Sequence, residues 1–229
     1  MTAKIVENPT YRERVRVFRD RFHAGKLLAE QLREHAHKLN VTLLALPAGG
    51  VPVGYEIAKE LGITMDVLIV RKIQIPWNTE AGFGALTWDG VKVLNNSLVR
   101  QLDLTREEID ESISQTRNII QERLRKFRRG KPMPEMKNKV VILVDDGLAS
   151  GFTMLAAASS VGKGKPQKVI VAVPTASNGA IELLASEVDE IVCLNIRSGS
   201  SFAVADAYEN WYDLTDQEVI KILENVENL

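Results

Sequence analysis

The sequence predicts an α/β domain with a mostly parallel sheet and helices on both faces. Short apolar runs, typical of parallel strands buried on both faces, alternate along the chain with segments of helical periodicity. The runs cover residues 41–46, 65–70, 140–144, 168–173 and 190–194. Because 229 residues of which 45% are hydrophobic suffice for one large core, and no repeat or linker divides them, we expect a single domain over residues 1–229 with its core at about 17–195.

Composition narrows the function classes. Lys and Arg total 29 and Asp and Glu total 30, so the formal charge of −1 excludes a general polyanion binder, and nucleic acid is not an expected partner. The single cysteine, Cys193, lies in an apolar run and is expected to be a small buried side chain in a reducing compartment. No apolar stretch has the length of a signal-peptide core or a membrane span, which predicts a cytoplasmic protein without a membrane partner.

The first elements are expected to be a helix, a strand and a second helix. Apolar residues at helical spacing, beginning at Phe18, predict a helix with one buried stripe over about residues 17–38. The strand at 41–46 then ends at a glycine turn, Pro-Ala-Gly-Gly at residues 47–50. Helical spacing resumes over residues 53–61.

The strand at residues 65–70 ends in the basic pair Arg71-Lys72 and leads into an excursion from the core. Turn-forming residues over 75–84 predict a flexible loop, and the pair Asp89-Gly90 between two short runs predicts a hairpin turn. We therefore expect a flexible loop and hairpin over about residues 73–89.

A long charged helix follows the excursion. The capping box that begins at Thr105 predicts its start, and Gly130 and Pro132 predict its end near residue 129. Its basic end is interpreted as cations opposing the helix dipole rather than as a nucleic-acid surface. Helices over about residues 154–161 and 180–186 complete the alternation with the last strands.

The segment with the strongest functional signal is residues 140–154, VVILVDDGLASGFTM. Its apolar run predicts a central strand, so Asp145 and Asp146 are expected at the carboxyl end, where open α/β sheets bind ligands. Residues 149–153 add small side chains, two hydroxyls and successive N–H groups at a helix start, which suit a phosphate monoester. Gly151 lets the backbone approach that anion closely.

The two carboxylates would repel the phosphate unless they bind something else. Ribose hydroxyls or the water shell of Mg²⁺ are suitable targets, so a ribose 5-phosphate fits both ends of the segment. The alternative is a plain strand-to-helix turn whose Asp residues cap the helix. That alternative is favoured for an Asp-Asp pair alone, but not for the whole arrangement.

The segment resembles the 5-phosphoribosyl 1-diphosphate (PRPP) binding motif of the type I phosphoribosyltransferases, and residues 141–153 meet that motif at each defined position. The resemblance extends to the glycine turn, to the basic pair Arg71-Lys72 and to the excursion at 73–89, which takes the place of the family's flexible catalytic loop. Together with Phe18-Arg19-Asp20-Arg21 and the stretch from residue 172 onward, the pattern is most similar to an uncharacterised branch of bacteria and archaea.

The resemblance implies a Mg²⁺-dependent enzyme that displaces pyrophosphate from C1 of PRPP with a nitrogen nucleophile. The implied PRPP-binding residues are Asp145, Asp146, Gly147, Leu148, Ala149, Ser150, Gly151, Phe152 and Thr153. The implied pyrophosphate-binding residues are Ala48, Gly49, Gly50, Arg71 and Lys72. Catalytic roles are implied for Asp145, Asp146, Lys72 and Glu80, with Asp145 and Asp146 holding the metal through water.

Three positions bear on the chemistry that the resemblance implies. Relatives in this branch often carry Arg where this chain has Ala48, so a side-chain contact to pyrophosphate is missing. Ala149 stands where hypoxanthine-guanine phosphoribosyltransferases have an Asp that exchanges a proton with the purine, which disfavours a purine of that kind as the acceptor. Glu80 is the nearest candidate acid or base in the mobile loop, and a solvated side chain is the alternative for it.

The acceptor is expected under a small hood built from about residues 196–229 and N-terminal residues. The hood's aromatic residues are interpreted as its core, with base stacking as the alternative: Phe202, Tyr208, Trp211 and Tyr212. A module that senses PRPP or a nucleotide without turnover is the alternative function, favoured by Ala48 and opposed by the complete loop containing Glu80. Hydrolysis, with water as the acceptor, is a third function, and a homodimer is considered as the assembly.

Overall fold

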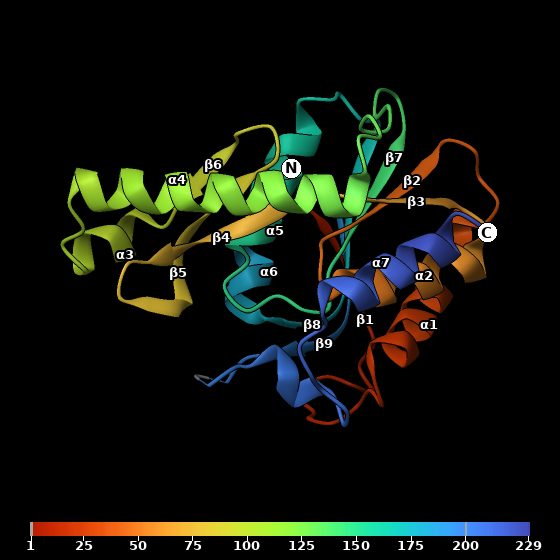
Figure 1. The fold of residues 1–229 in the computed structure, drawn as a ribbon. Coiled ribbons are helices and arrows are strands. Elements are labelled where there is room, and N and C mark those ends of the chain that lie inside the picture. The colour runs from red at the N-terminus through yellow and green to blue at the C-terminus, as the bar shows by residue number, and fades with distance from the viewer. Residues whose placement is uncertain (1, 200) are drawn as a thin grey trace.

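The computed structural model describes residues 2–199 and 201–229. Its centre is a six-stranded parallel sheet in the order β1-β9-β8-β7-β2-β3 (Figure 1). The strands are β1 (Lys4–Glu7), β2 (Val41–Ala45), β3 (Thr64–Val67), β7 (Val140–Val144), β8 (Lys168–Ser177) and β9 (Glu190–Arg197). The α/β fold with a mostly parallel sheet is thereby confirmed.

Four of the five predicted core strands are present as predicted, the one at 65–70 is only partly so, and β1 was missed. β1 has only four residues, Lys-Ile-Val-Glu, and none of them is fully buried. It pairs with β9 at one edge of the sheet. A strand this short and exposed has no apolar run by which the sequence could predict it. It is a strand because it pairs with β9.

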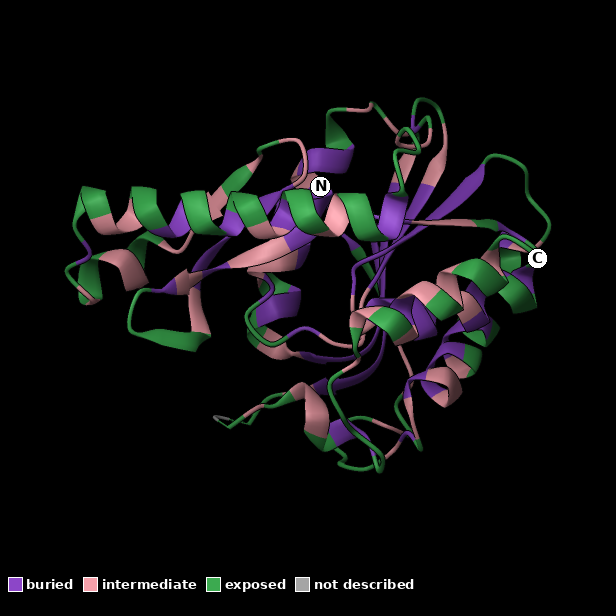
Figure 2. Ribbon diagram, viewed as in Figure 1, coloured by how far each residue is buried: buried purple, intermediate pink, exposed green. Residues whose placement is uncertain are grey.

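Helices cover both faces of the central sheet, which is why its strands are buried on both sides (Figure 2). In β7, Ile142 and Val144 join the core under α1, α2 and α7, whereas Val141 and Leu143 join the core under α5 and α6. These helices are α1 (Arg21–Gln31), α2 (Gly50–Leu61), α5 (Phe152–Gly162), α6 (Asn178–Leu184) and α7 (Asp216–Val226). The alternation of side chains along β7 therefore explains its continuous apolar run.

The N-terminal helix is shorter than the predicted span of 17–38. Asp20 is its N-cap and accepts a hydrogen bond from the His23 N–H, so α1 begins at Arg21. Phe18 is fully buried but precedes the helix, where it forms an isolated bridge with Tyr208. After α1 the chain makes only a short 3₁₀ turn, Arg33–His35.

The predicted strand at 65–70 is two strands in two sheets, and this prediction was wrong. β3 ends at Val67, and β4 (Val70–Ile75) starts a separate three-stranded antiparallel sheet with β5 (Asn78–Thr87) and β6 (Lys92–Leu94). Leu68 and Ile69 are buried between the two sheets, so the apolar run continues through the junction.

The predicted flexible loop at 73–89 is also mostly strand. β4 and β5 form a hairpin that carries the predicted loop glycines in its second strand. A β-carbon at Gly84 would lie 2.4 Å from the Val93 carbonyl oxygen, so this glycine permits close strand contact rather than marking a loop. The predicted hairpin turn at Asp89-Gly90 is present between β5 and β6.

The long helix begins at the predicted capping box. α4 (Arg106–Arg123) continues as a π-helical turn, Leu124–Arg128, and packs along the three-stranded sheet (Figure 1). Two short helical elements were not predicted, α3 (Asn96–Gln101) and a 3₁₀ turn at Val204–Ala207.

Asp89 ties the three-stranded sheet to the helix that carries the strongest sequence motif. Its carboxylate accepts hydrogen bonds from the hydroxyls of Thr87 (2.5 Å) and Ser160 (2.9 Å) and from Nζ of Lys163 (3.0 Å). Burial raises the pKa of Asp89, but these hydrogen bonds outweigh burial, so the pKa lies below its usual value.

We predict that Asp89→Asn lowers the free energy of unfolding by about 1–2 kcal/mol at pH 7, because one charge-assisted contact is lost. Since the folded-state pKa is lowered, the ionised carboxylate stabilises the protein above the unfolded pKa of about 4, and this contribution is lost as the pH falls through the folded-state pKa. Urea unfolding at neutral and acidic pH measures the difference. The exposed Asp110→Asn serves as control, with a change below about 0.5 kcal/mol; an equal loss in both variants would contradict the assignment.

Candidate active site

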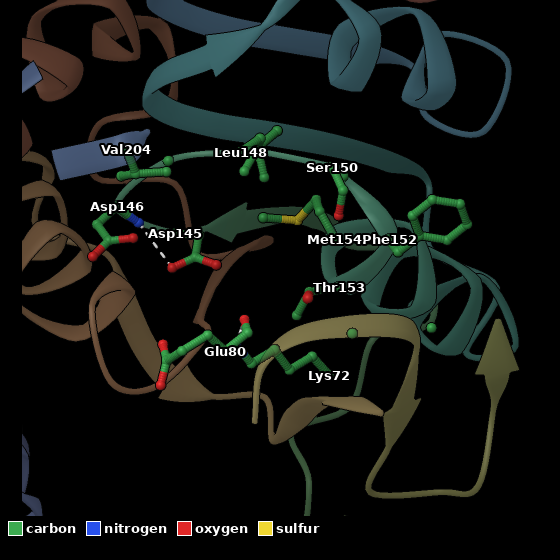
Figure 3. A pocket seen from close by; sticks show the side chains of 15 residues that line it. Lys72, Glu80, Asp145, Asp146, Leu148, Ser150, Phe152, Thr153, Met154 and Val204 are labelled. Atoms are coloured by element: carbon green, nitrogen blue, oxygen red, sulfur yellow. Dashed lines mark hydrogen bonds between the residues drawn. The ribbon is translucent and has the colours of Figure 1, made fainter. Parts of the chain in front are cut away.

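Strand β7, which lies between β2 and β8 in the middle of the sheet, delivers Asp145 and Asp146 to its carboxyl end. There they meet an open cavity of about 520 Å³ between the loop that follows β7 and the β4–β5 hairpin (Figure 3). The cavity is lined by Lys72, Glu80, Gly82, Gly84, residues 145–154 and Val204. All nine predicted PRPP-loop residues, together with the predicted catalytic residues Lys72 and Glu80, therefore lie around one space.

The loop after β7 is held in place by β8. The N–H of Leu148 donates to the Thr175 carbonyl, the N–H of Ser177 donates to the Leu148 carbonyl (both 2.9 Å), and the Ser177 hydroxyl donates to the Ala149 carbonyl at 2.6 Å. The hydroxyls of Ser150 and Thr153 point into the cavity (Figure 3). The backbone of residues 148 and 149 is therefore hydrogen-bonded to β8 in the absence of a ligand.

The start of α5 presents backbone donors to the cavity. Gly151 is the N-cap, with a positive φ of 80° that glycine adopts without strain. Because Gly151 has no side chain to cap the helix, the first N–H groups of α5 remain free for an anion. This geometry suits an anion, and phosphate binding by residues 149–153 stays a prediction.

The two carboxylates differ in their electrostatic surroundings. Burial and the neighbouring Asp146 charge raise the pKa of Asp145 well above its usual value. Burial also raises the pKa of Asp146, but the guanidinium of Arg21 opposes that rise. Within the described ranges, Asp145 forms no ion pair, so its carboxyl group is the one left available to a ligand.

Arg21 is a site residue whose contact the sequence did not indicate. Its Nε donates to Oδ2 of Asp146 at 2.8 Å, and the two side chains are only 7% and 13% exposed. Its Nη1 donates to the Tyr212 carbonyl at 2.9 Å, and its guanidinium stacks at 3.9 Å on the Trp211 ring. Arg21 and Asp146 are 125 positions apart, so no local pattern could connect them.

Two aromatic residues of the predicted hood, Tyr208 and Trp211, contact this ion pair, and Tyr212 contacts it through its backbone carbonyl. Tyr208 is buried, donates its hydroxyl to the Asp146 carbonyl at 2.6 Å and packs against Phe18 and Trp211. Trp211 and Tyr212 are 36% and 54% exposed, so the prediction that these two belong to the hood core was wrong. Phe202 lies under the guanidinium of Arg197, away from the cavity lining. Packing is therefore the observed role of Tyr208, as the sequence favoured.

The glycine turn lies against the acid pair. A β-carbon at Gly49 would lie 1.8 Å from Oδ2 of Asp146, and one at Gly50 would lie 2.5 Å from the Val144 carbonyl oxygen. Glycine is required at both positions for this close approach. The predicted pyrophosphate residues Ala48, Gly49, Gly50 and Arg71 border the acid pair or the hairpin rather than line the cavity itself, whereas Lys72 does line it.

The predicted catalytic pair from the hairpin comes together at the cavity. Nζ of Lys72 donates a hydrogen bond to the backbone carbonyl of Glu80 across the β4–β5 hairpin. Glu80 is exposed, and it lines the same cavity as the acid pair.

Cys193 is fully buried in β9, and burial raises the pKa of its thiol to about 12, as expected for an inert packing residue.

Two further findings concern metals and membranes. In the part of the chain that the structure describes, no three His, Cys, Asp or Glu side chains gather as a metal-binding group. The same residues include no helix with both the length and the apolar character that crossing a bilayer requires.

Comparison with known proteins identifies the family. Residues 90–207, about half of the chain, match the phosphoribosyl transferase domain family. The chain is a type I phosphoribosyltransferase family member. The matched region contains the acid pair and phosphate loop, while the glycine turn and the basic pair Arg71-Lys72 lie outside it.

Relatives of this phosphoribosyltransferase family member place it in an uncharacterised branch. Two Mycobacterium tuberculosis proteins, from strains CDC 1551 and H37Rv, are named "Putative phosphoribosyl transferase" and are 37% identical over 210 residues, 92% of this chain. The match covers 47% of each of them, so the chain spans about half the length of these curated relatives.

Solved structures confirm the fold. The crystal structure of TT1426 from Thermus thermophilus is 38% identical, with a TM-score of 0.72 over 91% of this chain and 98% of that one. The structure of AQ2163 from Aquifex aeolicus shares 12% identity, with a TM-score of 0.50 over 82% and 78% of the two chains. At that identity the second likeness shows the fold alone.

We predict that Asp145→Asn stabilises the free protein at neutral pH, because the wild-type folded state holds a buried carboxylate whose pKa is raised. Ionisation of Asp145 lowers the free energy of unfolding of the wild type. This loss is absent below the unfolded pKa of about 4, grows as the pH rises towards the folded-state pKa, and is constant above the folded-state pKa. Thermal unfolding in the presence of EDTA should therefore show a higher midpoint for the variant at pH 7.5, by about 2 °C or more, and a difference that disappears near pH 4. A lower midpoint at pH 7.5 would contradict this account of the acid pair.

Arg21→Gln is expected to have the opposite effect. It leaves the Asp146 carboxylate buried without its counter-charge, which destabilises by about 3 kcal/mol at neutral pH. Urea unfolding measures the loss, and the exposed Arg19→Gln on the same segment is the matched control, expected within about 0.5 kcal/mol of wild type.

Proposed function

We propose that this protein binds PRPP with Mg²⁺ and transfers its phosphoribosyl group to a nitrogen nucleophile, releasing pyrophosphate. The observation that carries the proposal is the continuity of the acid pair with a pre-formed phosphate loop around one cavity of about 520 Å³. Membership of the phosphoribosyltransferase family supports the same reaction class. The activity of the whole protein and its acceptor are part of the proposal.

The 5-phosphate is assigned to the start of α5. Residues 149–153 line the cavity, and the hydroxyls of Ser150 and Thr153 point into it; we assign the N–H groups of this segment to the same phosphate. The ribose hydroxyls are assigned to Asp145 and Asp146, whose carboxylates are hydrogen-bond acceptors at the carboxyl end of β7. Both assignments use donors and acceptors that the fold already holds in position.

The diphosphate is assigned to the glycine turn and the adjoining cations. Ala48 and Gly49 are assigned as backbone N–H donors, whereas the Gly50 N–H already donates to the Leu46 carbonyl at 3.0 Å. Arg71 and Lys72 offer positive side chains. The carboxylates of Asp145 and Asp146 fit Mg²⁺ held through its water shell together with diphosphate oxygens, since this ion is usually bound by one or two carboxylates plus substrate phosphates. When bound, the ion would neutralise negative charge on the leaving diphosphate.

In the proposed reaction the bond from C1 to the diphosphate oxygen breaks and a bond from C1 to the acceptor nitrogen forms. The ribose gains oxocarbenium character while negative charge develops on the diphosphate, so donors fixed around both ends lower the barrier. Lys72 and Glu80 stand on the hairpin that borders the cavity. We assign Lys72 to the diphosphate, Glu80 to proton exchange with the acceptor, and the hairpin to exclusion of water.

A module that senses PRPP without turnover is the second candidate. It is favoured by Ala48, which gives the turn no side-chain cation, and by the ion pair that engages Asp146 before any ligand binds. Assembly as a homodimer, a cytoplasmic location and a single-domain organisation over residues 1–229 stay predictions.

Calorimetry with PRPP and Mg²⁺ tests the binding site. Wild type should bind, and Asp145→Asn/Asp146→Asn should lose affinity by about 100-fold or more, because two charge-assisted contacts disappear. The exposed variant Asp110→Asn is the control and should bind as wild type does. Unchanged affinity in the double variant would overturn the site.

Pyrophosphate release separates the two candidate functions. The protein is incubated with PRPP, Mg²⁺ and a panel of heterocyclic bases and amines, and released pyrophosphate is measured. Release that depends on one class of acceptor supports the transferase. Tight PRPP binding without release for any acceptor supports the sensor, and release without acceptor supports hydrolysis.

A further inference from the structure

A second cavity lies among α1, α2 and α7, and we call it the helix cavity. It has a volume of about 260 Å³ and is lined by side chains of these three helices and of the segment just before α7. The helices are neighbours, since α1 packs on α2 and α2 packs on α7 (Figure 1). The helix cavity and the active-site cavity have no lining residue in common.

Three aromatic side chains line the helix cavity. Phe22 of α1 and Tyr55 of α2 meet edge to face, with ring centroids 6.5 Å apart and ring planes at 83°. Tyr212 comes from the segment before α7 and is 54% exposed, so much of its ring is open to contact. Aromatic rings arranged in this way pack well against another planar ring.

Polar side chains line the same cavity from one face of α7. Glu218, Lys221 and Asn225 follow one another at spacings of three and four residues, which places them in a row along the helix. Within the described residues, the exposed side chains of Lys221 and Asn225 form no hydrogen bond or ion pair. The amide of Asn225 can therefore offer both donors and an acceptor to the edge of a ring.

Size and charge narrow the class of ligand. The volume lies just below the roughly 300–1,000 Å³ typical of pockets for drug-sized molecules, which favours a ligand with one ring system. Aromatic rings can attract a cation, but Nζ of Lys59 already lies 5.9 Å from the Tyr55 ring centroid, and Lys221 adds a second ammonium group. A neutral planar ring with hydrogen-bonding nitrogen and oxygen atoms suits both the aromatic and the polar lining.

Two of the lining residues are attached to Arg21. Phe22 is the next residue of α1, and the backbone carbonyl of Tyr212 accepts a hydrogen bond from Nη1 of Arg21 at 2.9 Å. Nε of Arg21 in turn donates to Oδ2 of Asp146 at 2.8 Å. A ligand that packs on the Tyr212 ring would therefore stabilise the segment that holds Arg21 on Asp146.

We infer that the helix cavity is a second binding site, for a neutral planar nitrogen heterocycle such as the base of a nucleoside, and that its occupant opposes PRPP binding. The occupant favours the state in which Arg21 holds Asp146, whereas the proposed function uses that carboxylate for the ribose or for hydrated Mg²⁺. A ligand that prefers one of two states shifts the equilibrium towards that state, and the effect on affinity is reciprocal. The site itself is independent of the proposed function, and its effect on PRPP rests on that function.

Calorimetry without PRPP tests the site. The probes are adenosine and uridine, whose bases already carry a sugar and so are poor acceptors, and tetramethylammonium, a cation that suits aromatic cages. Wild type should bind at least one nucleoside and should bind tetramethylammonium more weakly. Tyr212→Ala should weaken nucleoside binding about fivefold or more, because stacking is lost, and Asn225→Ala about threefold or more, because a hydrogen bond is lost.

The controls separate loss of contact from loss of folding. Gln217→Ala removes an exposed amide of α7 that lies outside the lining, and it should bind nucleosides as wild type does. Tyr212→Phe keeps the ring and should keep nucleoside affinity within about threefold of wild type. Because Tyr212 and Asn225 are both exposed, thermal midpoints without ligand should stay within about 3 °C of wild type.

PRPP binding in Mg²⁺ is then measured with and without a saturating nucleoside. The nucleoside should weaken PRPP binding to wild type about fivefold or more, and this difference should disappear in Tyr212→Ala. Nucleoside binding that leaves the PRPP affinity of wild type unchanged would overturn the inferred effect on PRPP.

The remaining outcomes distinguish the site from the proposed function. Equal nucleoside affinity in wild type, Tyr212→Ala and Asn225→Ala would overturn the site while the proposed function stands. Tighter binding of tetramethylammonium than of either nucleoside would overturn the class of ligand. If the two variants lose nucleoside binding and wild type does not bind PRPP, the site stands and the proposed function fails.

Discussion

The structure depends on the burial of two adjacent carboxylates at the end of its central strand. β7 is covered by helices on both faces, and the two acidic residues that follow it are only partly exposed where they line the cavity. Removing a carboxylate from water is costly, and the raised pKa values of Asp145 and Asp146 express that cost. The fold offsets it for one residue of the pair only, through Arg21, and leaves the other carboxyl group for a ligand.

That one ion pair links distant parts of the chain. Arg21 belongs to the first helix, Asp146 to the loop after β7, and the carbonyl and ring that hold Arg21 belong to the segment before α7. Tyr208 adds a hydrogen bond from that segment to the backbone of Asp146. The first helix and the segment before α7 therefore both contact Asp146. A ligand that displaced Arg21 from Asp146 would change the contacts of both elements.

Anion recognition in this molecule needs no excess of positive charge. The formal charge is −1, yet the cavity is lined by the start of α5 and by Lys72. Each device acts at short range, where a fixed dipole or a half-buried cation is screened little by salt. The proposed binding of a small phosphate ester therefore does not require a net positive charge.

The order of strands and helices, the acid pair and the phosphate loop could all be predicted from residues close together in the sequence, because each rests on a local pattern. An apolar run makes a buried strand, and Gly151 makes a helix start without a side-chain cap, which suits an anion. Local patterns failed where one apolar run crosses between two sheets. Residues 65–70 are apolar apart from Asp66, but the chain leaves the central sheet at Leu68 and Ile69 and enters the three-stranded sheet.

By itself, then, the sequence determined the α/β class and the motif of residues 140–154. Only the tertiary structure decided which carboxylate is neutralised and that the expected loop glycines lie in a hairpin strand. The physical reason is that these facts are contacts between residues up to 125 positions apart, and such contacts arise from packing rather than from propensity or periodicity.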